Sequence, residues 1–235
     1  MQLSESFILK KNIYGEADFI LSIFTRDYGK ITGFAKNAKK SSRRFGGRLE
    51  PFIHLRIRFR ERSGRMNFVE DCETINVFSS FMRNVDLFAL GSFIMENIEI
   101  LVPKEEPNEK TFSLLVDTFS SLDSGASTLP ELLRFQLSIL KLSGLMPNLT
   151  SCAECGRVVD HRSPFSIKKG GFICSSCNSS KTLGLVLSRD FLLDSRLIDE
   201  DHGRAFKYIN LFRKFTEYHT GKEFKSFKLV EELCK

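Results

Sequence analysis

The spacing of apolar residues changes near residue 80, and this change restricts the possible fold more than any other feature of the chain. Before that point apolar and polar side chains alternate, as in "IHLRIRFRER" at residues 53–62. A period of two is typical of a strand with one buried face. From Phe81 to Leu101 apolar residues instead recur at steps of three and four, which is typical of a helix. The chain is therefore predicted to have a β part followed by an α part.

Five segments within the first 80 residues have the composition of short strands. They are rich in Ile, Phe, Val and Thr, and glycines such as Gly15, Gly29 and Gly64 stand in or beside the breaks. Five short strands suit a small closed barrel, of which the oligonucleotide-binding (OB) barrel is an example. We therefore expect an OB-type β-barrel at residues 1–79. Its strands are expected in "SFILKKNIYG", "DFILSIFTRD", "KITGFAK", "IHLRIRFRER" and "MNFVEDCETINVF".

The remaining residues, 80–235, are expected to form an all-α helical domain, so that the whole chain is an α+β protein of more than one domain. Apolar spacing predicts helices over 81–102 and 111–122. A third helix is expected to begin at a capping box that starts with Thr128 and to run to about Leu145.

Two further helices are expected after the cysteine-containing part of this domain. Ser188 can cap the first of them. In the second, Phe206, Ile209 and Phe212 recur at helical spacing. Gly221 is expected to end that helix, because glycine readily adopts the left-handed backbone of a C-terminal cap.

Four of the six cysteines form two C-x-x-C pairs, "CAEC" and "CSSC", with eighteen residues between them. Each pair lets two thiolates point at one centre, and the interval is long enough for a hairpin to bring both pairs around a tetrahedral ion. The pattern predicts one structural zinc ion in a segment at residues 150–180, inserted in the helical domain. Its expected ligands are Cys152, Cys155, Cys174 and Cys177.

Two other interpretations of these cysteines are weaker. Disulfides are disfavoured because the sequence shows no export signal and the cytosol keeps thiols reduced. A catalytic zinc usually has three protein ligands and an open position, whereas four thiolates close the coordination shell. A base deaminase would also need a His-x-Glu motif, and no histidine of the chain is followed by Glu two residues later.

The amino-terminal part of the chain is basic, with 15 basic and 7 acidic side chains in residues 1–70. Such a concentration suits nucleic acid or an anionic membrane surface, although a solvated face is the commoner reason for a run of charges. The most apolar stretch, 81–102, contains four charged residues, which argues against a membrane-spanning helix. We therefore expect a cytoplasmic protein without membrane contact.

Two neighbouring segments carry most of this positive charge. The stretch between the third and fourth strands contains paired serines and glycines and is expected to be a flexible loop. The fourth strand places a row of arginines on its outward face. Such cations can follow a phosphate chain, with salt-sensitive affinity and no readout of base sequence. The expected DNA-binding residues are Lys36, Lys39, Lys40, Arg43, Arg44, Arg48, Arg56, Arg58 and Arg60.

Four aromatic residues near these cations, Tyr14, Phe34, Phe45 and Phe52, could stack on unpaired bases. Because the chain has 23 phenylalanines and no tryptophan, most of its rings are expected in the core. The sequence shows no Walker-type loop, no nucleophile elbow and no cluster of carboxylates beside the basic loop. The pattern therefore predicts a binding protein rather than an enzyme.

Three parts of the sequence resemble the RecO family of bacterial DNA-repair and recombination mediators. "YGEADFILSIFTRDYGKITGFAKNAKKSSRRFGGRLEPF" resembles the amino-terminal barrel of that family. "LSILKLSGLMPNLTSCAECGR" with "GGFICSSC" resembles its helix-then-zinc segment, and "EYHTGKEFKS" resembles its closing helix. The resemblance covers nearly the whole chain in order. At one departure Asn37 stands where family members usually have glycine, and because Asn tolerates a left-handed backbone we expect the loop to keep its shape.

The resemblance implies more than the residues alone predict. RecO proteins have an OB barrel followed by a helical domain, which in many members carries a zinc-binding segment. They bind single- and double-stranded DNA, anneal complementary strands, and act with RecR to help load RecA on strands coated by single-strand-binding protein, with no known catalytic turnover. By analogy, the helical domain would take up the C-terminal tail of single-strand-binding protein, and the protein would be associated with the nucleoid.

Two other functional classes share part of this pattern. A zinc-ribbon RNA-binding or translation-associated protein would have a similar barrel and cysteines, and matched DNA and RNA oligonucleotides would distinguish it. A zinc-dependent nuclease or hydrolase would release products from labelled DNA. The other two cysteines add little: Cys72 is expected in the core, and Cys234 has no partner pattern.

Overall fold

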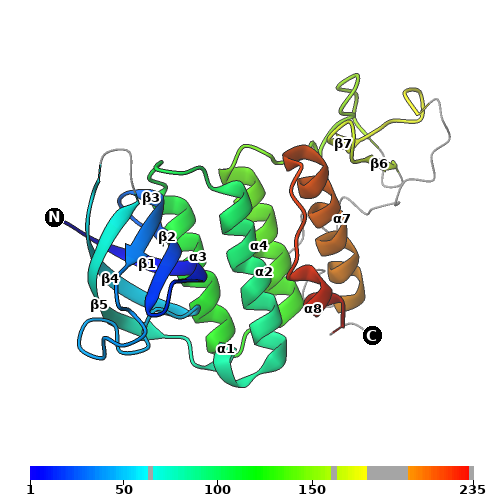
Figure 1. Cartoon of the computed structure of the whole chain (residues 1–235). Coiled ribbons are helices and arrows are strands. Elements are labelled where there is room, and N and C mark those ends of the chain that lie inside the picture. Colours follow the sequence, from blue (N-terminus) through cyan, green and yellow to red (C-terminus); the bar gives the residue numbers. More distant parts are fainter. Residues whose placement is uncertain (63–65, 160–162, 179–200, 233–235) are drawn as a thin grey trace. The chain divides into compact units, whose positions relative to one another are not determined.

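The computed structural model (Figure 1) describes most of the chain, namely residues 1–62, 66–159, 163–178 and 201–232. By their packing these residues form two compact units. The first is Met1–Thr128 with the segment that begins at Ser226, and the second is Leu129–Lys225. The first unit thus contains helices as well as strands. The predicted domain boundary between residues 79 and 80 marks where the strands end and the helices begin. The two units are instead defined by packing, so the predicted boundary stays a prediction.

Five strands of the first unit close into a barrel in the order β1–β2–β3–β5–β4 (Figure 1). Neighbouring strands are antiparallel except β3 and β5, which run parallel where Gly33 pairs with Asn67 and Phe34 with Phe68. The predicted five-stranded OB-type barrel is confirmed. Its strands are β1 (Gln2–Tyr14), β2 (Asp18–Thr25), β3 (Gly29–Ala35), β4 (Ile53–Arg60) and β5 (Asn67–Val77).

The alternating pattern of β4 has the expected result inside the barrel. Leu55 and Ile57 are wholly buried, whereas the arginines between and after them are exposed or half-buried. His54 stands at an even-numbered position, as the arginines do, so its side chain should point away from the barrel core. It is nevertheless buried. The reason is packing from outside the barrel: the His54 ring stacks on Phe7 with centroids 5.0 Å apart and lies 5.7 Å from Phe112.

A break at Asn84 divides the predicted helix 81–102 into α1 (Ser80–Arg83) and α2 (Val85–Leu101). Asn84 is extended, with φ −120° and ψ 121°, and its side chain accepts hydrogen bonds from two backbone N–H groups of the next turn. It therefore acts as the N-cap of α2. Sequence reasoning missed this break because the apolar period continues across it.

Helices α3 (Glu109–Asp123) and α8 (Phe227–Glu232) complete the first unit. Phe112 of α3 packs on the barrel, where its ring centroid lies 5.5 Å from that of Phe24. The α8 segment had no predicted structure, and it packs on α2 through the rings of Phe227 and Phe93, whose centroids are 5.1 Å apart. Helix α8 thus covers part of the apolar surface of α2.

The second unit contains α4 (Thr128–Leu142) from Leu129 onward, and α7 (His202–Thr220), joined by a hydrogen bond from Gln136 Nε2 to the Ile209 carbonyl (3.2 Å). As predicted, α7 ends at Gly221, whose φ is +66°. Helix α4 ends three residues before the predicted end. The helix predicted to begin at Ser188 lies outside the described residues. None of the described helices is both long and apolar enough to cross a membrane.

Candidate nucleic-acid interface and metal centre

The basic loop, defined as residues 36–50, joins β3 to β4. It is anchored to the barrel, because Phe45 and Leu49 are buried in the barrel core. The Arg44 carbonyl also accepts a hydrogen bond from the N–H of Cys72 on β5 (3.2 Å). The cations of the basic loop therefore extend from a packed and hydrogen-bonded base, and the flexibility expected of the loop stays a prediction.

Asn37 makes the first turn of the basic loop. Its φ is +54°, in the left-handed region, and its N–H donates to Asp18 Oδ1 at 2.7 Å. Asparagine tolerates this backbone conformation, and that the loop keeps the shape usual in the family stays a prediction.

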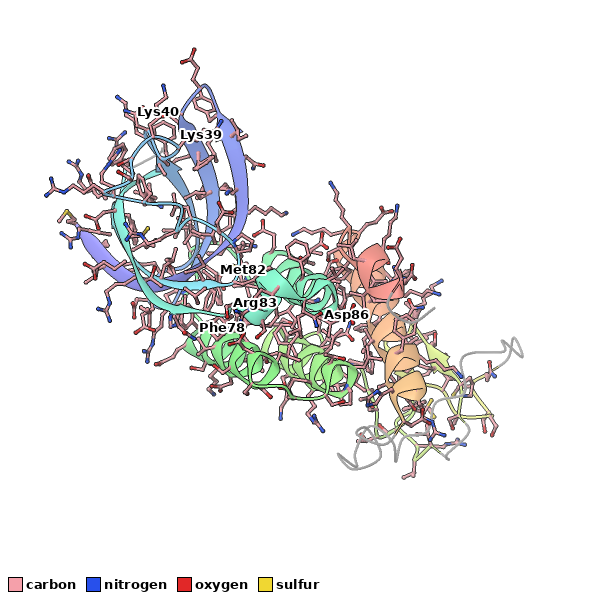
Figure 2. The ribbon with its side chains drawn as sticks, turned by 90° about the horizontal axis from the view of Figure 1, so that it is seen from below. Lys39, Lys40, Phe78, Met82, Arg83 and Asp86 are labelled. Atoms are coloured by element: carbon pink, nitrogen blue, oxygen red, sulfur yellow. The ribbon has the colours of Figure 1, made fainter. Side chains whose placement is uncertain are left out.

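Four of the predicted DNA-binding residues extend from the basic loop into solvent. They are exposed, and none forms an ion pair with a carboxylate of the described residues. Figure 2 shows two of them, Lys39 and Lys40, on the side of the barrel away from Met82 of α1. We call these four residues the free loop cations: Lys36, Lys39, Lys40 and Arg43.

Two further predicted residues, Arg44 and Arg48, brace the loop. Arg44 Nη2 donates to the Lys36 carbonyl at 2.6 Å, and Arg48 Nε donates to the Phe45 carbonyl at 2.9 Å. Both side chains are half-buried. They fix the backbone from which the free loop cations extend, and they keep positive charge next to it.

The arginine row of β4 is partly neutralised by β5. Arg58 Nε lies 3.6 Å from Asp71 Oδ1, and Arg60 forms an ion pair with Glu70. Arg56 is exposed and has no ion pair with the described part of the chain. Strand β5 pairs with β4 along one of its edges. The basic loop runs along the other edge, where the N–H of Cys72 donates to the loop. The structure therefore does not join all nine predicted residues into one continuous positive surface.

The structure separates the four candidate stacking residues into two groups. Phe45 and Phe52 are each 1% exposed, so they are core residues and cannot stack on bases. Tyr14 is 55% exposed and lies edge-to-face with Phe34, with centroids 6.0 Å apart. A ring that sequence reasoning missed, Phe68, lies 6.3 Å from Phe34. The alternation of side chains in the fifth strand already placed Phe68 on the outward face, and this pattern could have identified it from the sequence.

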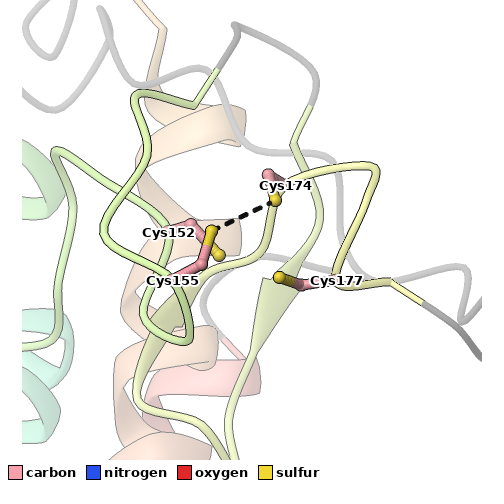
Figure 3. Close-up of side chains that lie close together, drawn as sticks. All are labelled: Cys152, Cys155, Cys174 and Cys177. Atoms are coloured by element: carbon pink, nitrogen blue, oxygen red, sulfur yellow. Dashed lines mark hydrogen bonds between the residues drawn. The ribbon is translucent and has the colours of Figure 1, made fainter.

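The four cysteines come together as predicted (Figure 3). Their Sγ atoms all lie within 4.8 Å of one another, and those of Cys155 and Cys174 are 3.6 Å apart. A tetrahedral zinc with Zn–S bonds of about 2.3 Å separates its sulfurs by about 3.8 Å. The cluster therefore fits one tetrahedral metal ion with a closed shell, and zinc as that metal stays a prediction.

Tight turns present these thiols to one centre. The N–H of Gly156 donates to the Cys152 carbonyl at 2.9 Å, and the left-handed backbone of this glycine (φ +74°) closes the first turn. In the second turn the N–H of Cys177 donates to the Cys174 carbonyl at 3.1 Å. The two turns are held near each other because the N–H of Ala153, in the first turn, donates to the carbonyl of Phe172 at 2.8 Å. Phe172 belongs to β7 (Gly171–Phe172), which pairs with β6 (Phe165–Ser166) and precedes the second turn.

Hydrogen bonds make the Cys152 thiol unusually acidic. Burial raises its pKa, but backbone N–H groups of Cys174, Cys155 and Glu154 together lower the pKa to about 6. Hydrogen bonds with the Cys155 and Cys174 side chains raise the pKa of Cys177 to about 12. A bound dication removes the remaining protons, because metal-coordinating thiols are deprotonated.

Fold and site together define a class of protein: an OB-type barrel with attached helices, a cation-bearing loop and a cluster of four cysteines that fits a metal ion. Two family models match this chain, "Recombination protein O N terminal" over residues 1–78 and "Recombination protein O C terminal" over residues 82–226. The chain therefore belongs to the RecO family.

Similar proteins from several bacteria carry the same name. A DNA repair protein RecO from Myxococcus xanthus is 29% identical over 238 residues, which cover 97% of this chain and 96% of the relative. The protein of that name from Syntrophus aciditrophicus is 30% identical, with 98% and 95% covered. The one from Koribacter versatilis is 36% identical, with 75% and 72% covered. The similarity thus extends over most of the length of each chain.

Proposed function

We propose that this protein acts in DNA repair and homologous recombination as a mediator that binds single- and double-stranded DNA without sequence specificity and anneals complementary strands. One observation carries the proposal: the free loop cations are displayed, without carboxylate partners among the described residues, from a loop anchored on an OB-type barrel. The names of the relatives, DNA repair protein RecO, support the cellular role.

The electrostatics of the basic loop favour recognition of the phosphate backbone. Each phosphate that a lysine or arginine neutralises releases counterions, so affinity falls as salt rises. Four such contacts give a log–log slope of about −3 for a single strand. Lysine presents a point charge that fits any backbone phosphate, so this contact does not distinguish one base sequence from another.

Annealing follows from the same charges. Two complementary strands repel each other across a distance of about the Debye length, and cations between them reduce that repulsion. Because the cations hold phosphates, the base edges stay free to pair. Base pairing then supplies the specificity, and the protein needs no catalytic residue for this step.

The partners are proposed from family membership. With RecR, the protein would help load RecA on strands coated by single-strand-binding protein, in association with the nucleoid. A cavity of about 410 Å³ in the second unit is lined by Phe165, Ile173 and Leu211 and by two lysines, Lys207 and Lys214. Its apolar wall and positive charges suit the acidic, phenylalanine-ended tail of single-strand-binding protein. The four-cysteine cluster is proposed to hold one structural zinc ion.

The proposal is tested by titrating a labelled single strand with the protein at graded salt and by measuring annealing of complementary strands. The variant Lys39→Gln/Lys40→Gln/Arg43→Gln should weaken binding, flatten the salt dependence and slow annealing. A control that removes the same charge from exposed lysines elsewhere is Lys110→Gln/Lys168→Gln/Lys228→Gln, which should bind like the unaltered protein.

Two outcomes would contradict the proposal. The first is absence of binding by the unaltered protein at low salt. The second is a stronger preference for RNA than for DNA of the same sequence, which would favour the RNA-binding alternative.

A further inference from the structure

One line of paired residues crosses the outer face of the barrel. Ile20 of β2 pairs with Phe34 of β3, Phe34 pairs with Phe68 of β5, and Phe68 pairs with Arg60 of β4. In β2, β3 and β5, the residue that directly follows Ile20, Phe34 or Phe68 along the chain is buried in the barrel core. Strand parity therefore directs the side chains of this line outward.

Three aromatic rings lie together on this face. The centroid of Phe34 is 6.0 Å from that of Tyr14 and 6.3 Å from that of Phe68. Tyr14 is 55% exposed, and the two phenylalanines are half-buried. We call these three residues the aromatic row. No apolar element of the described chain covers Tyr14, so its ring offers apolar area to a ligand.

Cations flank the aromatic row at one end. The guanidinium of Arg62 lies 4.9 Å from the centre of the Phe68 ring, and that of Arg60 lies 5.7 Å from it. Guanidinium groups stack on bases as aromatic rings do, so these arginines add further stacking groups at this end of the row. Near the other end Lys36, one of the free loop cations, stands two residues after Phe34.

A cleft that is lined in part by Phe34 of the aromatic row has room for a base. Its volume is about 1210 Å³, and Phe34 and Arg62 line it together with Asn67. Its charged lining is balanced, with three acidic side chains (Asp27, Glu61 and Glu105) and three basic ones (Lys30, Lys104 and Arg62). A base carries no net charge and can use both the aromatic wall and the amide of Asn67.

We propose that the aromatic row is the site where unpaired bases of a DNA strand stack, while the basic loop holds the phosphates of the same strand. The inference rests on the proposed function, because it adds a second contact to the same DNA-binding surface. Base stacking on aromatic side chains is tolerant of sequence and requires bases that are not enclosed in a duplex. The row is therefore a contact for single strands alone, whereas the basic loop can hold the phosphates of single strands and duplex alike.

The absence of tryptophan in the chain allows a direct test. Phe68→Trp introduces a single indole in the aromatic row, and Tyr218→Trp introduces one on the exposed face of α7 as a control. A thymidine oligonucleotide should quench the fluorescence of the first variant and not of the second. An abasic oligonucleotide of equal length has the same phosphates without bases, and it should quench neither.

A second measurement uses the variant Phe34→Leu/Phe68→Leu, which keeps apolar side chains in β3 and β5. Its affinity for the thymidine oligonucleotide should fall roughly ten-fold or more, with an unchanged salt slope. Its affinity for the abasic oligonucleotide and for duplex should stay the same. Tyr218→Ala is the matched control and should bind every oligonucleotide like the unaltered protein.

The outcomes separate this inference from the proposed function. If the unaltered protein binds DNA but the leucine variant loses nothing, or if the tryptophan is quenched equally by the abasic strand, the aromatic row is not a base site and the proposed function stands. If the unaltered protein binds no DNA at low salt, both fail together.

Discussion

Arg58 Nε on β4 lies 3.6 Å from Asp71 Oδ1 on the adjacent strand β5. The regular spacing of arginines in β4 suggested an external anion, yet the nearest anions of Arg58 and Arg60 are carboxylates of the protein itself. An arginine that already has a carboxylate partner releases fewer counterions from DNA than a free one, because it must first give up that partner. The nine predicted DNA-binding residues are therefore not equivalent.

This difference predicts an order of effects on DNA binding. Lys39→Gln/Lys40→Gln should reduce the slope of log affinity against log salt by about 1.4 for a single strand. Arg58→Gln/Arg60→Gln removes the same charge and should reduce it by less than about half as much. Titration of a labelled strand at several salt concentrations measures both slopes. Equal reductions would mean that the β4 arginines exchange Asp71 and Glu70 for phosphate when DNA binds.

The barrel and the metal cluster could be predicted because local patterns determine them. Alternation in β4 fixes which side chains enter the core, and the two C-x-x-C pairs fix which thiols can share an ion. The pairing of Arg58 with Asp71 could not be predicted in the same way. It depends on the register of β4 against β5, and two irregularities, at His54/Leu55 and Arg58/Phe59, shift that register.

The anchoring of the basic loop was also out of reach of sequence reasoning. Its serines and glycines indicated flexibility, and nothing in its spacing showed that Phe45 and Leu49 enter the barrel core. Phe68 was missed for a similar reason: its neighbour in the row, Phe34, comes from β3, and only closure of the barrel brings β3 beside β5. Contacts between distant segments decided both points.

Metal removal should affect the second unit selectively. The unaltered protein should contain one zinc per chain by elemental analysis, and Cys155→Ser should lose it, because three thiolates and a weaker ligand hold zinc less tightly. A chelator should make residues 150–178 sensitive to protease while the first unit keeps its DNA binding. Cys72→Ala removes a thiol from the barrel and should keep the zinc. A full zinc content in the Cys155 variant would contradict the proposed ligand set.

Two glycines with left-handed backbones should respond differently to the same substitution. At Gly29 (φ +65°) a Cβ would lie 2.2 Å from the Glu106 carbonyl oxygen, whereas at Gly47 (φ +74°) it would meet no atom within 4 Å. Gly47→Ala should lower the free energy of unfolding by about 1 kcal/mol, from backbone strain alone. Gly29→Ala should lower it by at least about 2 kcal/mol more, because the backbone of Glu106 must move. Urea unfolding measures both, and equal losses would exclude the close approach.

The buried imidazole of His54 should make stability depend on pH. Burial lowers its pKa below 6.5, and this effect outweighs the opposing influence of Glu5, whose Oε2 lies 3.1 Å from Nε2. Between pH 6.5 and the lower pKa of the folded state, the unfolded chain binds more protons than the folded one. Stability therefore falls as pH falls through this window, and the contribution of His54 is complete above it.

Urea midpoints at pH 7.5 and 5.5 test this dependence. Replacement of His54 by phenylalanine keeps a ring between Phe7 and Phe112 but removes the titrating group, so His54→Phe should lose less stability on acidification than the unaltered protein. His219 is exposed on α7, and His219→Phe should keep the original dependence. If His54→Phe and the unaltered protein lose the same stability between the two pH values, the folded state does not hold His54 neutral, and the packing of Phe7 and Phe112 is not what sets its charge.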